Sequence, residues 1–238
     1  MSMAIVIEAS LGSACLPGQA LRSLAGRTLL EHCVTRLRAS GLPIIVAAAS
    51  DASDDPLEQA AGALGVSLYR GEMDNVLARV LGAAGAFGVT EIIRASVSQP
   101  AVDIDGVRRI AELRRRVHAD HAIECGLPQG SAVEAVTVDA LRRSREMVAD
   151  PYDLAHVTSF IRRHARFTSM RAVAPGHLRR PGLRLAVLTM ADVEFMHGVL
   201  SSTPTPAPSA PLEEIIAVAE AAVVRLERAR LSATRKGA

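Results

Sequence analysis

AIVIEASLGSACLPGQALRSLAGRTLLEH, residues 4–32, is the stretch that decides the fold. Its apolar start at residues 4–7 is typical of a buried strand, and from Leu29 onward apolar residues recur at helical spacing. The loop between them is punctuated by glycine and proline. Strand, glycine-rich loop and helix in this order often hold a phosphate group. Residues 9–20 nevertheless carry no charged side chain. The order of elements is therefore that of a phosphate-binding site, but the loop lacks the cations that would bind the phosphate.

Short apolar runs alternate with helical patterns along the chain. Strands are expected at residues 4–7, 43–48, 66–69, 91–95, 122–125, 135–138, 167–173 and 183–188. Helices are expected at residues 28–39, 56–64, 75–87, 105–117, 139–148, 154–164 and 191–200. This alternation is typical of βαβ units. We therefore predict an α/β fold, a three-layer Rossmann-like sandwich around a mostly parallel sheet, with ligands at the carboxyl edge of its strands.

The composition changes after residue 200. Residues 1–200 are expected to form one domain, and residues 201–211, SSTPTPAPSAP, have the composition of a linker. Residues 212–230 then form a strongly apolar helical pattern. Such a helix must either dock on the body of the protein or pair with another subunit.

Bulk composition excludes several classes of function. Aromatic residues make up 3% of the chain and the formal net charge is +2, which argues against a nucleic-acid binder. No apolar run is long enough for a membrane span, and the start has no signal-peptide pattern. The three cysteines, Cys15, Cys33 and Cys125, show no paired spacing, which favours a reducing compartment. We therefore predict a cytoplasmic protein without a nucleic-acid or membrane partner.

Several short motifs follow one another in a fixed order. Residues 8–19 read EASLGSACLPGQ, residues 24–32 read LAGRTLLEH and residues 70–79 read RGEMDNVLAR. DPY at residues 150–152 is followed by HVT at residues 156–158. In this order the motifs resemble those of the cytidylyltransferases that make CMP-activated acidic sugars, in particular the branch of spore coat polysaccharide biosynthesis. The resemblance spans about residues 4–230.

This resemblance implies a nucleotidyltransferase fold, CTP and Mg²⁺ as the family's nucleotide and metal, and a homodimer formed through a protruding element at residues 126–164. The residues that match the family's nucleotide-binding turn are Gly12, Ser13, Leu16, Pro17 and Gly18. Those that match its substrate-binding positions are Arg79, Arg94, Asp103, Glu134, His156 and Arg184. Each has a structural alternative: Arg94 could pair with Asp103, and His156 could cap a helix or lie in the core.

The positions that carry the family's chemistry are changed. Two arginines and one lysine of the first loop correspond to Ser10, Cys15 and Gln19, and the two metal-binding aspartates correspond to Ser98 and Leu188. Lys236 is the only lysine in the chain, so no other lysine can replace the lost one. We therefore predict that no catalytic residue is retained, that no metal is held and that no cofactor is used.

Three hypotheses follow. The first is a diverged, catalytically impaired family member related to CMP-sugar synthesis for surface glycans, which binds a nucleotide, an acidic sugar or a partner enzyme. The second is an active nucleotidyltransferase with an altered site, built on Asp103 with Asp51 or Glu8. The third is a non-enzymatic dimeric scaffold. An ion pair between Glu8 and Arg94 or Arg184 would favour the first hypothesis, because it would neutralise the site internally.

Overall fold

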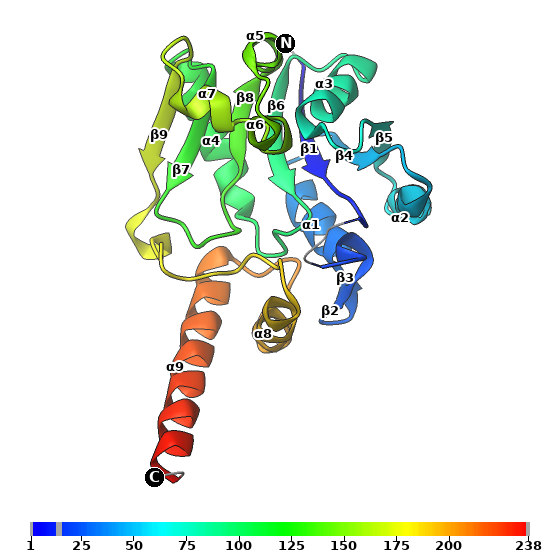
Figure 1. Ribbon diagram of the computed structural model, residues 1–238. Coiled ribbons are helices and arrows are strands. Elements are labelled where there is room, and N and C mark those ends of the chain that lie inside the picture. The colour runs from blue at the N-terminus through cyan, green and yellow to red at the C-terminus, as the bar shows by residue number, and fades with distance from the viewer. Residues whose placement is uncertain (1, 13–15, 237–238) are drawn as a thin grey trace.

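In the computed structural model, which describes residues 2–12 and 16–236, one seven-stranded sheet forms the centre of the molecule (Figure 1). Its strands, in spatial order, are β5 (Ser67–Gly71), β4 (Ile44–Ala49), β1 (Met3–Glu8), β6 (Glu91–Ser96), β8 (Glu134–Thr137), β7 (His121–Cys125) and β9 (Ser169–Val173). All neighbours pair in parallel except β8, which is antiparallel to both β6 and β7. The predicted α/β class with a mostly parallel sheet is confirmed.

Helices cover both faces of this sheet. They are α1 (Leu29–Arg38), α2 (Asp55–Ala63), α3 (Val76–Ala86), α4 (Ile104–Arg116), α5 (Val138–Met147), α6 (Pro151–Ala155), α7 (Ser159–Arg163), α8 (Met190–Ser201) and α9 (Leu212–Lys236). Side chains alternate along β1: Ile5 and Ile7 enter the core under α1 and α4, whereas Val6 enters a second core under α3 and α5. Two cores on opposite faces of one sheet make the three layers that the sequence predicts.

A two-stranded hairpin, which the sequence analysis did not predict, joins the first loop to α1. Its strands are β2 (Ser23–Leu24) and β3 (Arg27–Thr28). Ala25 and Gly26 between them both have positive φ, as a tight primed turn requires. Thr28 then caps α1 in a capping box with Glu31. The hairpin thus fixes where the first helix begins.

Residues 183–188, predicted as a strand, do not join the sheet. The segment makes only an isolated bridge, between Arg184 and Gln129, with backbone hydrogen bonds of 2.8 Å on either side of it. Leu185 and Val187 are nevertheless buried. The apolar pattern therefore predicted the burial of this segment correctly. Its hydrogen-bonding partner, however, is the loop at Gln129 and not another strand.

The helix predicted at residues 154–164 is divided into α6 and α7. The break lies at Val157, whose φ of 42° is rare for a β-branched residue. The amide of Thr158 donates to the carbonyl of His156 across this tight turn. The turn places the Thr158 hydroxyl against Glu134, so the break serves the buried cluster described below.

Residues 126–164 contribute to both the sheet and a helical layer. β8 lies between β6 and β7, and α5 and α7 pack on the side of the sheet that α3 also covers. Dimerisation through this segment remains a prediction.

The segment before α9 is held to the core by Arg36, which is fully buried. Its guanidinium donates to the carbonyls of Val102, Ala207 and Ala210 at 2.8–2.9 Å. Burial lowers the pKa of Arg36 to about 10, although the charge of Asp103 opposes that effect. The start of the C-terminal helix is therefore fixed in place.

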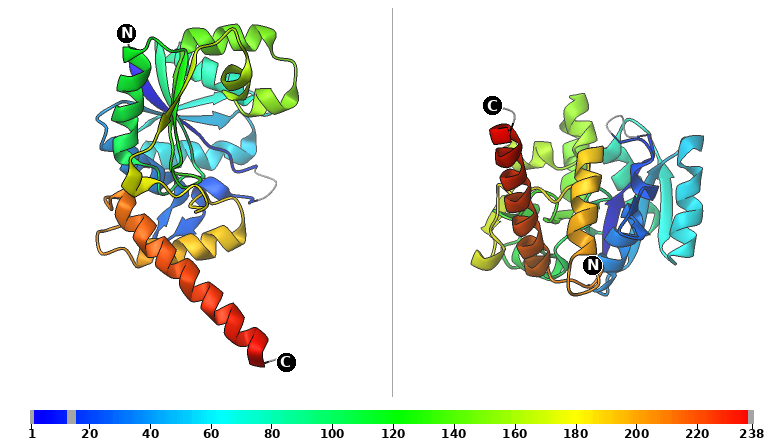
Figure 2. Two further views of the ribbon diagram at one scale, coloured as in Figure 1. Left: turned by 90° about the vertical axis from the view of Figure 1, so that its left-hand side faces the viewer. Right: turned by 90° about the horizontal axis from the view of Figure 1, so that it is seen from below.

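The first turns of α9 dock on the body through Leu212, Ile215 and Ala219, and the rest of the helix extends away from it (Figures 1 and 2). We refer to residues 223–236 as the α9 tail. Within the described part of the chain, no helix combines the length and the apolar content that crossing a bilayer demands.

Candidate functional site

The sequence-predicted site lies where β1 and β6 end and β8 begins. Glu8 is the last residue of β1, Arg94 lies near the end of β6, and Glu134 is the first residue of β8. The backbones of Arg94 and Glu134 are directly paired across the sheet. Because β8 is antiparallel, its start reaches the same edge as the carboxyl ends of its neighbours, so the three side chains converge there.

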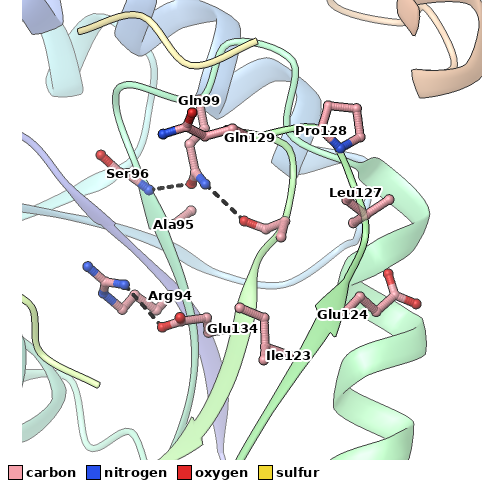
Figure 3. A pocket seen from close by; sticks show the side chains of 12 residues that line it. Arg94, Ala95, Ser96, Gln99, Ile123, Glu124, Leu127, Pro128, Gln129 and Glu134 are labelled. Atoms are coloured by element: carbon pink, nitrogen blue, oxygen red, sulfur yellow. Dashed lines mark hydrogen bonds and ion pairs between the residues drawn. The ribbon is translucent and has the colours of Figure 1, made fainter. Parts of the chain in front are cut away.

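These residues form a cluster of ion pairs. Arg94 binds both carboxylate oxygens of Glu8, at 2.5 and 2.8 Å. It also donates to Glu134 at 3.0 Å (Figure 3). Glu134 also accepts from the Thr158 hydroxyl at 2.6 Å and from Arg162 at 3.3 Å. A bidentate arginine–carboxylate contact is a strong and directional interaction. We call Glu8, Arg94, Glu134 and Thr158 the buried cluster.

Electrostatics within the buried cluster favour the charged forms of Glu134 and Arg94. Burial alone would raise the pKa of Glu134, but the nearby charges of Arg94 and His121 and the Thr158 hydroxyl hold it well below its ordinary value. Burial alone would lower the pKa of Arg94, but Glu8 and Glu134 raise it above its ordinary value. The two carboxylates of the cluster face one guanidinium, and Arg162, 3.3 Å from Glu134, supplies the second positive charge.

A cavity of about 230 Å³ lies beside the buried cluster. Its lining includes Arg94, Glu124, Gln129 and Glu134 (Figure 3). Gln99 spans one wall, because its side-chain oxygen accepts from the Ser96 amide and its nitrogen donates to the Ala132 carbonyl. The cavity is smaller than the 300–1,000 Å³ that is usual for ligand pockets.

The first loop, predicted to bind a nucleotide, turns at Gly18. Gly18 has a φ of 70°, and its amide donates to the carbonyl of Leu11 at 2.9 Å. The buried carboxylate of Asp54 accepts from the amide of Leu11 at 2.7 Å and from that of Ala49 at 3.0 Å. The other predicted turn residues are placed as follows: Gly12 is exposed, Leu16 is buried and Pro17 is exposed. Ser13 and Cys15 lie outside the described residues.

At the positions where the family's charges are missing, the side chains bind within the protein. The Ser10 hydroxyl accepts from the Gly12 amide at 3.1 Å, and Gln19 donates to the Val187 carbonyl at 2.6 Å. The hydroxyls of Ser98 and Ser96 lie 2.9 Å apart. Leu188 is partly exposed and offers no side-chain oxygen to a metal. None of these four described side chains presents a charge.

Arg79 is buried beside the first loop. Its guanidinium donates to the carbonyls of Glu72 and Met73 at 2.7 and 3.0 Å, while its buried Nε has no hydrogen-bond partner. Burial lowers the pKa of Arg79 from its ordinary value, against the charge of Glu8. Arg79 lines a small cavity of about 120 Å³ together with Glu8 and Gln19. It is the predicted substrate-binding residue with an unused donor.

Like Arg79, the predicted site residues Asp103, His156 and Arg184 lie outside the buried cluster. Asp103 pairs with Arg109 at 2.5 Å, and Arg109 also binds Glu124, so the suggested pairing of Arg94 with Asp103 is wrong. The reason is that Asp103 precedes α4 and faces the next turn of that helix. Arg184 is exposed and binds Asp192 at 2.7 Å.

His156 is exposed and its ring packs against Tyr152, edge to face, with ring centroids 4.1 Å apart. It is therefore neither a core histidine nor a member of the buried cluster.

The carboxylates that could replace the lost metal ligands are engaged elsewhere. Glu8 is bound to Arg94, Asp103 to Arg109, and Asp51 accepts from the Ser53 amide. Across residues 2–12 and 16–236, no three His, Cys, Asp or Glu side chains gather in a way that could hold a metal ion.

Sequence reasoning did not find Gln99, which lines the cavity, or Arg109 and Arg162, which pair with two of its lining carboxylates. Arg162 donates to the carboxylate of Glu134, 28 residues earlier in the chain. No local sequence pattern predicts a contact over that separation. Only the sheet order and the turn at Val157 bring the two side chains together.

Comparison with known proteins agrees with this architecture. Residues 4–230 match the sequence profile of the cytidylyltransferase family. SpsF, a spore coat polysaccharide biosynthesis protein of Bacillus subtilis, is 29% identical over 197 residues, or 79% of this chain and 82% of SpsF. A cytidylyltransferase structure from Leptospira borgpetersenii serovar Hardjo-bovis has a TM-score of 0.83 at 22% identity, covering 92% of this chain and 94% of that one. CMP:2-keto-3-deoxy-manno-octonic acid synthetase in complex with CTP has a TM-score of 0.66 at 17% identity, covering 84% and 99%. By the family match over most of its length, the chain belongs to the cytidylyltransferase family.

Proposed function

We propose that this member of the cytidylyltransferase family is impaired in nucleotidyl transfer and acts by binding an acidic ligand or a protein partner. Its relationship to SpsF supports a role near the synthesis of CMP-sugars for surface glycans. The observation that carries the proposal is the ion pair between Glu8 and Arg94, which uses both oxygens of the carboxylate. An arginine held in this way is not free to bind a phosphate.

The loss of cations argues against triphosphate binding. Nucleotidyl transfer from CTP needs positive groups around the phosphates as charge develops. Ser10 and Gln19 are neutral, and Glu8 adds a negative charge next to them. Each charge-assisted contact is worth roughly 1.5–3 kcal/mol. Losing three of them weakens triphosphate binding by roughly three orders of magnitude or more.

The donor set at the positions of the family's metal ligands does not fit Mg²⁺. This ion is normally held by one or two carboxylates together with substrate phosphates and water. Here a serine hydroxyl, already paired with Ser96, and a leucine side chain occupy the two positions. We therefore derive no step through a metal.

A binding role is compatible with the groups that remain available. The cavity beside Arg94 is open to small polar ligands, and the Nε atom of Arg79 is a buried donor without a partner. A buried polar atom of this kind is costly unless something satisfies it. Arg79 is therefore the residue most suited to contact an acidic ligand.

One observation favours a scaffold as a second candidate function. The α9 tail extends away from the body with apolar side chains uncovered, as an assembly element would. The alternative of an active enzyme with an altered site has no comparable support, because Glu8, Asp51 and Asp103 are all engaged.

Release of pyrophosphate from CTP, with Mg²⁺ and a panel of acidic sugars, tests the proposal. The wild-type chain should give no release above background. A variant with Ser10→Arg, Gln19→Lys, Ser98→Asp and Leu188→Asp should bind CTP in the presence of Mg²⁺. A matched variant with asparagine at positions 98 and 188 should not, because it adds similar volume without charge. Magnesium-dependent release by the wild-type chain would overturn the proposal.

A further inference from the structure

A second cavity lies at the edge of the sheet opposite to the buried cluster. Its volume of about 760 Å³ is usual for a ligand pocket, whereas the cavity beside Arg94 is smaller. Glu91, the first residue of β6, and Thr137, the last residue of β8, line it and are paired across the sheet. Figure 1 has this edge at the top, beside α5 and away from α9. The second cavity shares no lining residue with the cavities near Arg94 and Arg79, so it is a separate site.

The floor of the second cavity is apolar, and its mouth is polar. Val89, Ala119 and Val138 line the cavity and are almost completely buried. Thr90 and His118 also line it and are exposed, so they lie at the mouth. Apolar groups that release water on contact favour an apolar ligand surface. The floor therefore suits the hydrocarbon part of a small molecule.

The buried carboxylate of the second cavity is already neutralised. One oxygen of Glu91 lies 2.9 Å from a guanidinium nitrogen of Arg114, and the other lies 3.0 Å from Arg115. A carboxylate that is paired on both oxygens no longer requires a cation from a ligand. Glu91 therefore does not make this a site for a positively charged molecule.

Arginine is in excess around the second cavity. Asp120 and Asp139 both line it, and both pair with Arg143 beside them. Arg142 also lines the cavity and is exposed, and its side chain forms no hydrogen bond or ion pair within the described part of the chain. The four arginines at the cavity thus face three carboxylates, which leaves one positive charge over.

Arg114 supplies a hydrogen-bond donor that the described residues leave unused. The residue is 6% exposed and lines the cavity. One guanidinium nitrogen donates to the carbonyl of Ala119 at 3.1 Å and another binds Glu91, but the buried Nε has no partner among the described residues. A buried donor without a partner is costly, so an acceptor in the cavity would be stabilising.

The helix ends at the second cavity also favour an anion. Helix α5 begins there, because its N-cap residue Thr137 and its first residue Val138 both line the cavity. The N-terminus of a helix attracts negative charge. The end of α4 has the opposite dipole, but Arg114, Arg115 and Arg116 in its last turn offset that effect.

We propose that the second cavity binds a small organic monoanion, a carboxylate attached to an apolar body. Arg142 pairs with the carboxylate, Arg114 adds a buried donor, and the apolar body packs on Val89 and Val138. A carboxylate fits the single surplus charge better than a phosphate monoester, which carries about two negative charges. The cavity is distinct from the nucleotide site, so this inference stands or falls independently of the proposed function.

Calorimetric titration of the full chain with cinnamate and with octanoate tests the proposal. Each carboxylate should bind at one site per chain. Cinnamamide keeps the apolar body without the charge, and acetate keeps the charge without the body. Both should bind at least ~10-fold more weakly, because each loses one of the two contacts. Absence of saturable binding for both carboxylates, or equal binding of cinnamate and cinnamamide, would overturn the proposal.

A pair of arginine variants tests the charge contact. Arg142→Met should lower the affinity for cinnamate at least ~10-fold, the effect expected for one charge-assisted hydrogen bond. Arg145→Met is the matched control: it removes the same group from an exposed position of the same helix that does not line the cavity, and the affinity should not change. Equal affinities of the two variants would contradict the assignment of the anion to Arg142.

A pair of variants at the mouth locates the ligand. Thr90→Phe places a ring at the cavity mouth and should abolish binding of cinnamate, whereas Thr90→Val has the shape of the natural residue and should bind as the wild type does. Thermal unfolding of both variants checks that they are folded. Cinnamate binding that survives Thr90→Phe, or that CTP displaces, would place the ligand elsewhere and overturn the proposal.

Discussion

The first loop and the buried cluster lie at the same edge of the sheet, yet they differ in what they have kept of the family pattern. The loop has the glycines and proline of a nucleotide-binding turn but has none of the three cations that the resemblance implies. The buried cluster has Arg94 and Glu134 at the matching positions and gains a third charge at Glu8. The loop is neutral between residues 9 and 20, whereas the buried cluster carries three charges.

The physical cost of losing a charge explains this difference. A cation in an exposed loop can be replaced without harm to the fold, because it mainly serves the ligand. In contrast, removal of one partner from a buried ion pair leaves an uncompensated charge and costs about 3–5 kcal/mol. A buried ion pair is therefore more costly to lose than a cation in a loop that serves a ligand.

The largest effect should come from breaking the buried cluster. Arg94→Met leaves Glu8 without its cation and Glu134 with only its longer contact to Arg162, so the free energy of unfolding should fall by about 3–5 kcal/mol. Arg162→Met is the matched control. It removes the same group from the same carboxylate, but from a side chain that is 36% exposed, and should cost less than about 1 kcal/mol. Urea unfolding of both variants measures the contrast, and equal losses would contradict the account.

The second largest effect should be a loss of stability in acid, through protonation of Glu134. Because the pKa of folded Glu134 lies below its unfolded value, the native state holds fewer protons than the unfolded state. The stability from Glu134 is complete above the unfolded pKa of about 4.3 and is lost as the pH falls toward the folded value. Unfolding followed between pH 6 and pH 2 should show this loss, and Glu134→Gln should flatten that part of the curve. An unchanged slope in the variant would place the acid sensitivity elsewhere.

Charges introduced at positions 10, 98 and 188 should have a small effect on the fold. Ser10 and Ser98 are half-buried and Leu188 is partly exposed. Ser10→Arg, Ser98→Asp and Leu188→Asp should each change the free energy of unfolding by less than about 1 kcal/mol. Chemical unfolding of the single variants checks this. A loss comparable to that of Arg94→Met would mean that the loop residues are structural rather than free to vary.

The smallest effect should come from Arg184, which forms an exposed pair. Its contact with Asp192 is screened by solvent, so Arg184→Ala should cost about 0.5 kcal/mol. Thermal unfolding at low and high salt measures it, and the difference between wild type and variant should shrink as salt rises.

Local patterns were sufficient for much of the fold. Strand β1, the first loop and α1 follow directly from apolar spacing and a capping residue at Thr28. The same patterns failed where the neighbour is decided by tertiary structure. Leu185 and Val187 are buried as a strand would be, but they pack beside a loop.

For the candidate site, the sequence predicted which residues matter more readily than how they pair. Arg94 and Glu134 were identified from motifs, and an ion pair between Glu8 and Arg94 was considered as one outcome. The alternative partner of Arg94, Asp103, instead forms an ion pair with Arg109, which lies in the helix that Asp103 precedes. Spacing along the chain does not tell which of two carboxylates, Glu8 or Asp103, pairs with Arg94, because they come to the sheet edge from different segments.

Calorimetric titration of CTP into the full chain, in low salt, with and without Mg²⁺, tests the central claim most directly. The account predicts that Mg²⁺ does not tighten any binding of CTP by the wild-type chain, because no carboxylate is available at positions 98 and 188. Binding that strengthens with Mg²⁺ would show a rebuilt metal and triphosphate site and would contradict the account.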